Sequence, residues 1–367
     1  MAATTERCTD GIAKPLPPEW FIQKDTSAEM RWEAMQGQDY LVPTERFFVR
    51  NHTSTPLVDP LSYELEIHGR GLRGGPVRFS YDQLTSLPSV ERTVAIECAG
   101  NGRALLEPRP LSQPWLAEAI GTAEWSGVAL APLLEEAGLR DDAVEVLFTG
   151  LDRGIEGGIE QSYQRSLSRW DALGPDAMLA YAMNGAAVPP QHGFPLRLVI
   201  AGWYGMAHVK WLTTITALTE PFDGYQQSVG YRMYGADGVA GEPVTRIMPR
   251  SLTIPPGIPD FFTRARTLDA GPCTLRGRAW SGWAPIARVE VSTDDGATWA
   301  DAALDEPLGE RAWRGWSLDW DAAPGEHVVS SRATDTAGNV QPLEPPWNLK
   351  GYANNVVERI PVTVRTT

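Results

Sequence analysis

The sequence has 367 residues, of which 43% are hydrophobic and 21% are charged, and its formal net charge is −14. A chain of this length has room for two domains, and this composition is ordinary for a soluble globular protein. The negative charge argues against long-range attraction to nucleic acid or to an anionic membrane. An anionic substrate would therefore need a local basic pocket.

The cysteines are Cys8, Cys98 and Cys273, which are widely spaced and form no CxxC motif. This pattern excludes a disulfide framework, a zinc knuckle and a c-type haem attached to this chain. No apolar run approaches the ~18 residues that a membrane span needs. The N-terminus is polar and has no apolar signal core, so we expect a cytoplasmic protein, or a periplasmic one if an export signal has been removed.

The first part of the chain combines strand-like and helix-like patterns. Residues 1–45 contain several prolines and are predicted to form an irregular lead-in. Residues 46–247 are predicted to form a mixed α+β domain, with a short helix at 127–139. Apolar or alternating runs predict strands at 46–52, 61–70, 93–98, 143–150, 195–202 and 208–218.

The composition changes after this part. Residues 248–261 carry four prolines and are predicted to form a linker. Residues 262–367 alternate apolar and polar side chains in short runs, with a hairpin turn at Asp295-Gly296. This pattern predicts an immunoglobulin-like β-sandwich as the second domain.

The stretch TVAIECAGNGR, residues 93–103, places a cysteine where a strand ends and a small-residue turn begins. Such a cysteine is most often a small buried hydrophobic residue. Its neighbours favour another role, because Gly100 and Gly102 allow close approach of a ligand and Arg103 suits an oxyanion. Cys98 alone cannot form a structural zinc site. It could be a nucleophile, or one soft ligand to a metal that brings its other ligands with it.

The motif IECAGNGR resembles the cofactor-ligand motif of the sulfite oxidase family, molybdenum-pterin enzymes that also include the eukaryotic nitrate reductases. Other segments resemble family segments in the same order, namely 47–52, 121–128, 183–212, 289–299 and 337–352. The resemblance extends over about residues 46–355. It implies a molybdenum-molybdopterin domain followed by an immunoglobulin-like dimerisation domain, and hence a homodimer.

The resemblance also implies roles for individual residues. Cys98 matches the family's metal ligand, which binds molybdenum beside the two dithiolene sulfurs of the pterin. Arg50 and Arg103 match substrate-oxyanion ligands, and His52 matches a cofactor contact. A surface arginine and an ordinary hydrogen-bonded histidine are the alternatives for Arg50 and His52.

Two aromatic residues are further candidates. Tyr225 matches the active-site tyrosine near the oxo group, although Tyr231 and Tyr234 lie close in the sequence and could confuse this alignment. Trp125 is expected to form a wall of the pocket, with a core tryptophan as the alternative.

Four basic side chains, His192, Arg197, His208 and Lys210, lie within a short stretch of sequence. The pterin carries a phosphate and many hydrogen-bonding edges, and converging cations and imidazoles would suit it. The resemblance assigns these four residues to cofactor binding. Further candidates for cofactor binding are Phe48, Asp152 and Tyr163.

Two departures from the family pattern concern basic residues near the site. Gly102 stands where the family usually has the first of two arginines, and Lys350 stands where many sulfite oxidases carry arginine. We expect Lys350 to reach back from the second domain and lend a cation to the substrate pocket. A solvated surface lysine is the alternative.

The resemblance thus implies an enzyme without haem in this chain that oxidises sulfite to sulfate and passes electrons to an external acceptor. A second interpretation is oxidation or reduction of another oxyanion or sulfur compound, such as nitrate or a thiosulfate-derived group. A third is a non-catalytic cofactor-binding or interaction protein, which an intact Cys98 and Arg50 argue against.

Overall fold

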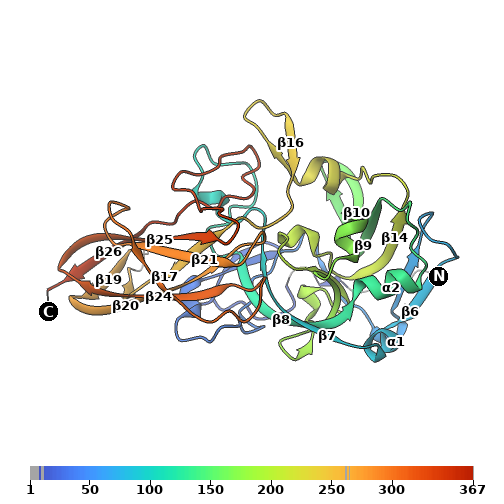
Figure 1. Cartoon of the computed structure of the whole chain (residues 1–367), viewed down its shortest axis with the longest axis horizontal. Helices are drawn as coiled ribbons and strands as arrows, with labels where there is room; N and C mark the ends of the chain where they lie inside the picture. Colours follow the sequence, from blue (N-terminus) through green and yellow to red (C-terminus); the bar gives the residue numbers. More distant parts are fainter. Residues whose placement is uncertain (1–7, 10–11, 261–262, 264, 367) are drawn as a thin grey trace.

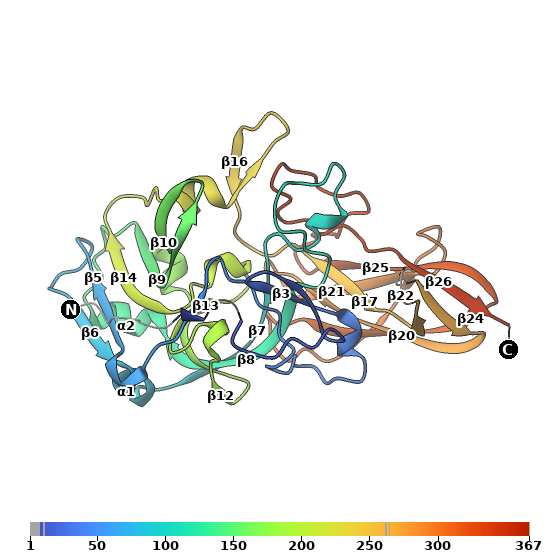
Figure 2. The ribbon, with the colours of Figure 1, turned by 180° about the vertical axis from the view of Figure 1, so that it is seen from behind.

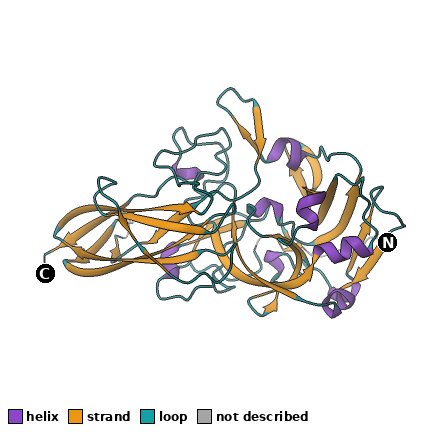
Figure 3. Ribbon diagram, viewed as in Figure 1, coloured by secondary structure: helices purple, strands orange, loops and turns teal. Residues whose placement is uncertain are grey.

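The structure is a computed structural model that describes residues 8–9, 12–260, 263 and 265–366. Strands predominate over helices and form two lobes that lie side by side along the long axis (Figures 1 and 3). Within the described residues, no helix is both long and apolar enough to cross a membrane.

The N-terminal segment is more regular than expected. Strands β2 (Phe21–Lys24) and β3 (Ser27–Met30) form a hairpin, and the 3₁₀ helix η1 (Trp32–Met35) follows. The prediction of an irregular lead-in is therefore wrong for this stretch, while residues 1–7 and 10–11 lie outside the described part. In Figure 2 this segment crosses the junction between the lobes, where the Trp32 and Trp313 rings meet edge to face at 5.6 Å.

The first domain contains two five-stranded sheets. The order of one is β10 (Ile159–Ser168), β9 (Glu145–Glu156), β14 (Leu212–Leu218), β5 (Glu64–His68) and β6 (Val77–Ser80). The order of the other is β12 (Ala186–Ala187), β11 (Ala177–Met183), β8 (Ile120–Ala129) and β7 (Val90–Glu97), and β13 (Arg197–Ile200) also pairs with β11. Strands β14 and β5 run parallel, and the other pairs are antiparallel.

The α-helices of the first domain are short. They are α1 (Tyr81–Ser86), α2 (Leu130–Glu136) and α3 (Arg169–Leu173), so the described part of this domain is mostly β rather than evenly mixed α+β. The helix expected at 127–139 begins later, because its first residues complete β8. The strand expected at 46–52 is reduced to a single bridge between Val49 and Ala28.

Shorter elements complete the first domain. They are β1 (Cys8–Thr9), β4 (Thr55–Pro56), β15 (Arg232–Tyr234), β16 (Ala240–Pro243), the 3₁₀ helices η2 (Pro60–Ser62), η3 (Arg103–Leu105), η4 (Pro190–His192) and η5 (Gly205–Ala207), and the π-helix η6 (Gln226–Gly230). The β15–β16 hairpin projects from the molecule near the junction of the lobes (Figure 1).

The second domain is a sandwich of two sheets. The order of one is β17 (Arg250–Ile254), β20 (Gly271–Trp280), β24 (Arg314–Ala322) and β23 (Ala303–Leu304). The order of the other is β18 (Ile258–Pro259), β19 (Arg266–Asp269), β26 (Ile360–Arg365), β25 (Gly325–Asp335), β21 (Ile286–Ser292) and β22 (Ala300–Asp301). The buried face of each sheet contributes apolar side chains to one core, including Leu275, Trp316, Val289 and Val329.

The predicted linker at 248–261 is wrong over residues 250–254. Residues 250–254 form β17, which pairs antiparallel with β20, and Leu252 is buried. The prolines of this segment flank the strand and leave its backbone donors free to pair. An immunoglobulin-like strand order remains a prediction.

Candidate active site

A cavity lies in the first domain beyond the end of β7, where loops from several strands converge. Every residue that the sequence assigned to cofactor binding lines this cavity, together with Arg50. The lining residues are Phe47, Phe48, Arg50, His52, Ile96, Cys98, Ala99, Asp152, Tyr163, His192, Arg197, Gly205, Met206, His208, Lys210 and Tyr231. The topology therefore gathers side chains that are far apart in the sequence.

Cys98 directly follows β7, and its thiol is free and half-buried. Its amide donates a hydrogen bond to the carbonyl of Ala119 at 2.9 Å, which continues the β7–β8 pairing past the end of the strand. Burial raises the pKa of the Cys98 thiol, while the nearby charges of Arg50 and Arg103 oppose this rise. The two guanidinium groups thus favour the thiolate that binds a metal.

Lys210 and Arg197 are held by backbone carbonyls. The Lys210 ammonium donates to the carbonyls of Arg50 and Gln191, each at 3.0 Å, and to the side-chain oxygen of Asn51. The Arg197 guanidinium donates to the carbonyl of His192 at 2.7 Å. Each cation is thereby fixed in position without being neutralised.

The charges of this cavity do not balance. Asp152 is the acidic side chain among the lining residues, against the cations Arg50, Arg197 and Lys210. Burial lowers the pKa of Arg197 to about 9, and burial together with the Arg197 charge lowers that of Lys210. Burial also raises the pKa of Asp152 to about 6. A bound anion would relieve this repulsion, as the pterin phosphate would.

The histidines of the cavity are neutral at ordinary pH. Burial lowers the pKa of His208 to about 3, and it also lowers those of His52 and His192, with neighbouring cations adding to the effect. A neutral imidazole offers one donor and one acceptor, which suits the edge of a pterin ring. His52 already uses one ring nitrogen, which lies 2.9 Å from the Tyr231 hydroxyl.

Several buried polar atoms of the cavity have no hydrogen-bond partner among the described residues. They are Nε2 of His192, Nε of Arg197 and Oδ1 of Asp152. Buried polar atoms are normally paired, so these three atoms indicate a polar ligand. A soft thiolate, fixed cations and unpartnered hydrogen-bonding atoms are the donor set that a molybdenum-pterin with a phosphate requires, and the residues present therefore fit the group.

Of the residues predicted to act on the substrate, Arg50 is the one that lines the cavity. Arg103 is buried and donates to the Lys350 carbonyl at 2.6 Å and to the Ser112 hydroxyl at 3.0 Å. The charge of Arg103 lowers the pKa of the Cys98 thiol, but its guanidinium already binds protein groups and does not line the cavity.

The other three predicted substrate-side residues also lie outside the cavity wall. Trp125 is fully buried beneath Arg197, whose guanidinium lies 4.8 Å from its ring. The Lys350 ammonium donates to the carbonyls of Val229 and Gly230 at 2.7 and 3.0 Å. Tyr225 packs against Gly157, where a Cβ added to the glycine would lie 2.7 Å from the tyrosine hydroxyl.

Of the three neighbouring tyrosines Tyr225, Tyr231 and Tyr234, Tyr231 is the one that lines the cavity, and its placement corrects the expectation for Tyr225. Tyr231 is buried, contacts His52 through its hydroxyl and stacks on Tyr352 of the second domain with ring centroids 5.2 Å apart. The only signal in the sequence was the proximity of three tyrosines, and the intervening π-helix decides which one turns inward.

A polar groove adjoins the cavity and shares Arg50, His52, Asp152 and Tyr163 with it. Glu156 on β9 also lines this groove, and its carboxylate accepts a hydrogen bond from the Gln226 side chain at 2.5 Å. The groove therefore meets the cavity on the side that carries Arg50.

Comparisons with known proteins agree with this geometry. Residues 52–226 match the family described as oxidoreductase molybdopterin binding domain, and residues 260–365 match the family described as Mo-co oxidoreductase dimerisation domain. The crystal structure of the sulfane dehydrogenase SoxCD from Paracoccus pantotrophus superposes with a TM-score of 0.81 at 26% identity, covering 96% of this chain and 91% of that chain.

Several relatives bear the name sulfite oxidase. The mitochondrial sulfite oxidase of Homo sapiens is 35% identical over 89% of this chain, and the matched part spans 62% of the human protein's length. The sulfite oxidase of Gallus gallus is 34% identical, and the match covers 92% of this chain and 76% of that protein. The chain therefore belongs to the sulfite oxidase family of molybdopterin oxidoreductases.

Proposed function

We propose that this protein is a molybdenum-dependent oxidoreductase that converts sulfite to sulfate. Sulfite and water give sulfate, two protons and two electrons, and the electrons pass to an acceptor outside this chain. The observation that carries the proposal is the convergence of the Cys98 thiol and the Arg50 guanidinium in one cavity, where three buried polar atoms have no partner among the described residues.

The chain's residues divide the work between cofactor and substrate. Cys98 would bind the molybdenum, and Arg197, Lys210 and His192 would hold the phosphate and the pterin edges. When bound, the cofactor would supply oxygen-atom transfer and storage of the two electrons. Arg50, at the boundary between cavity and groove, would bind the oxyanion by a planar fork of donors.

Tyr231 and His52 would position the substrate through uncharged hydrogen-bonding groups. Burial raises the pKa of Tyr231 well above its ordinary value, so its hydroxyl stays protonated and can donate a hydrogen bond. The lowered pKa of His52 keeps the imidazole neutral beside Arg50. The positive charge that faces the anion then comes from Arg50, which favours binding of small oxyanions.

A second candidate substrate is a sulfur compound other than sulfite. The specific observation is the whole-chain superposition on a sulfane dehydrogenase. The groove is polar and carries the Glu156 carboxylate, which would disfavour a highly charged anion and tolerate a sulfur group presented on a neutral carrier. Nitrate remains a third candidate within the same chemistry.

The test is metal analysis of protein from a host that makes the cofactor, followed by a sulfite-dependent dye-reduction assay. The proposal expects about one molybdenum per chain and turnover that depends on sulfite. Molybdenum without sulfite turnover, but with turnover of thiosulfate or nitrate, would favour the second interpretation. Protein without molybdenum would overturn the proposal.

We also propose that the protein is a cytoplasmic homodimer. The match to a dimerisation domain over 260–365 supports the dimer. Sedimentation should give about twice the chain mass of 40.2 kDa. A monomer at micromolar concentration would contradict the dimer and leave the chemistry untouched.

A further inference from the structure

The residue before Cys98 is bound by the second domain. The Glu97 carboxylate is buried at the end of β7 and lies 3.2 Å from the Arg250 guanidinium of β17. It also accepts hydrogen bonds from the Trp280 indole at 2.8 Å and from the Asn101 amide at 2.9 Å. The start of the Cys98 loop is thus fixed from both sides.

We call residues 97–103 the Cys98 loop. Beyond Glu97, this loop is held by the segment 350–354. The Ala353 amide donates to the Ala99 carbonyl at 2.8 Å, and the Asn354 side chain donates to the Gly102 carbonyl at 2.7 Å. At the end of the loop, Arg103 donates to the Lys350 carbonyl. Within the loop, Glu97, Ala99, Gly102 and Arg103 therefore each bind a residue of the second domain.

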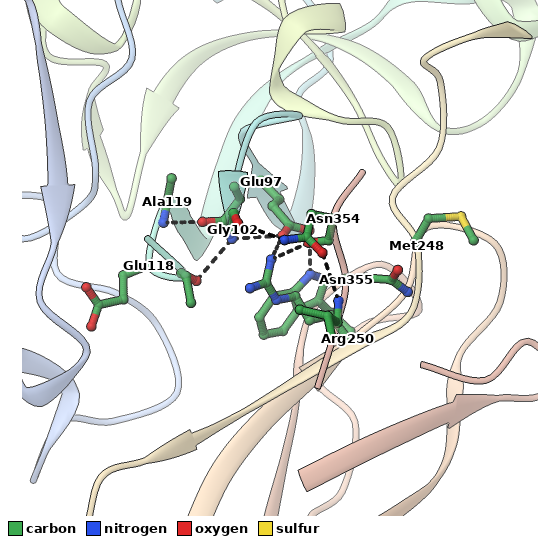
Figure 4. Close-up of polar contacts among 12 residues, drawn as sticks. Glu97, Gly102, Glu118, Ala119, Met248, Arg250, Asn354 and Asn355 are labelled. Carbon is green, nitrogen blue, oxygen red and sulfur yellow. Dashed lines mark hydrogen bonds and ion pairs between the residues drawn. The ribbon is translucent and has the colours of Figure 1, made fainter. Parts of the chain in front are cut away.

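Arg250 joins these two sets of contacts. Its guanidinium binds the Glu97 carboxylate and also donates to the Asn354 carbonyl at 3.0 Å, and Figure 4 shows the three residues close together. Because Arg250 is only 1% exposed, the contact is shielded from water. A single buried cation therefore links the start of the loop to the segment that holds its end.

Gly102 makes room for this arrangement. Its φ of +82° is unfavourable for other residues, and a Cβ here would lie 3.0 Å from the Asn354 amide nitrogen and 3.2 Å from an Arg250 guanidinium nitrogen. The space beside the turn is thus filled by side chains of the second domain. This accounts for a glycine at a position where the resemblance led us to expect arginine.

We propose that Arg250 and Asn354 are positioning residues that fix the Cys98 loop in the conformation a metal ligand needs. They touch neither the cavity nor the reacting atoms, and they act through Glu97 and Gly102. The second domain would then be part of the metal site of its own chain, besides any role in dimerisation. The inference rests on the proposed role of Cys98 as ligand.

The test measures hydrogen exchange of the loop in the full-length chain. The amides of Asn101 and Arg103 are hydrogen-bonded within the loop, to the carbonyls of Cys98 and Gly100, so their exchange reports its order. The variants are Asn354→Ala and the pair Glu97→Gln with Arg250→Met, which removes both charges together. The matched control is Glu290→Gln with Arg332→Met, a 2.8 Å ion pair within the sandwich.

We expect exchange in 97–103 to become at least about tenfold faster in both loop variants and to stay within about twofold in the control. Arg250→Lys keeps a cation beside Glu97 and should restore part of the protection. If the paired variant does not fold, Asn354→Ala alone decides. Unchanged exchange in a folded Asn354→Ala protein would overturn the proposal.

A second measurement separates this inference from the proposed function. Molybdenum retained per chain after dialysis should fall several-fold in the loop variants and not in the control. If wild-type protein contains no molybdenum, the proposed function fails, whereas the exchange result still shows whether the second domain orders the loop. Faster exchange with full retention of molybdenum would overturn the link between loop order and metal binding.

Discussion

Charged side chains are arranged differently around the cavity of the first domain and in the sandwich of the second. In the first, the cations Arg197 and Lys210 lie around one cavity, where they donate to carbonyl and amide oxygens, and Asp152 is the acidic side chain among the lining residues. In the second, charged side chains form pairs such as Glu290–Arg332 at the edge of the core and Asp269–Arg365 at the surface. Unpaired buried charge costs stability, so the first domain holds a binding site and the second supplies a stable support.

The largest expected effect concerns Cys98. Cys98→Ser replaces a soft thiolate with a hard hydroxyl, so turnover should fall by at least about a thousandfold while the fold is kept. The control is Cys273→Ser, which changes a half-buried thiol on β20 in the second domain. Steady-state assays and molybdenum content measure both. Equal loss in the two variants would show that the effect is not specific to the cavity.

Two variants, one in the cavity and one in the sandwich core, should separate effects on cofactor binding from effects on stability. His192→Leu removes a buried imidazole whose Nε2 has no partner in the described part of the chain, so the unfolding free energy of the cofactor-free chain should change by less than about 1 kcal/mol. Molybdenum occupancy should nevertheless fall about tenfold. Val289→Ala in the sandwich core should instead cost about 2 kcal/mol and leave occupancy unchanged. Denaturant titration and metal analysis would reveal any reversal of this pattern.

The buried histidines predict a pH dependence of stability. The pKa of His208 is about 3 in the folded chain, against 6.5 ordinarily, and that of His192 is also lowered, so below 6.5 the unfolded chain binds more protons. The contribution of these two neutral histidines to the free energy of unfolding is fully present above pH 6.5 and is lost as the pH falls below it. Asp152, with its pKa raised to about 6, takes up a proton on folding and offsets part of this loss.

For the cofactor-free chain, we expect the unfolding free energy to fall by about 2 kcal/mol between about pH 7.5 and 5.5. His192→Leu should reduce this slope, because one of the responsible imidazoles is removed. Urea titrations at a series of pH values measure the effect. A flat profile across this range would contradict the burial of neutral histidines.

The smallest effect is expected for Lys350. Its ammonium binds the carbonyls of Val229 and Gly230 and lies outside the cavity wall. Lys350→Ala should therefore raise KM for sulfite by no more than about threefold, through a shift of the adjacent Tyr231. Arg50→Ala should raise it by at least about a hundredfold. Comparable effects of the two substitutions would place Lys350 in the substrate pocket after all.

The sequence was informative where a local pattern determines the structure. Alternating residues predicted the strand around Ile67, and the apolar run before Cys98 predicted β7 and the position of the thiol at its end. The side chains of His192, Arg197, His208 and Lys210 were expected to converge, and they line one cavity. The strands were predicted from the periodicity of apolar residues, and the cavity residues from a long motif. A single sequence contains both signals.

The sequence was misleading where distant parts of the chain determine the structure. Proline-rich composition hid β17, because Pro249 and Pro255 flank the strand without interrupting it. Nothing local distinguishes Tyr231 from Tyr225, since the packing against His52 and Tyr352 selects the first. The ties between the Cys98 loop and the second domain likewise join residues far apart in the chain.

The central claim is that Cys98 completes the ligands of a molybdenum-pterin bound in this cavity. X-ray absorption at the molybdenum edge counts the sulfur atoms around the metal. The account predicts about three sulfurs in the wild-type chain, two from the pterin and one from Cys98, and about two in Cys98→Ala. The same sulfur count in both proteins, or no molybdenum in the wild type, would contradict it.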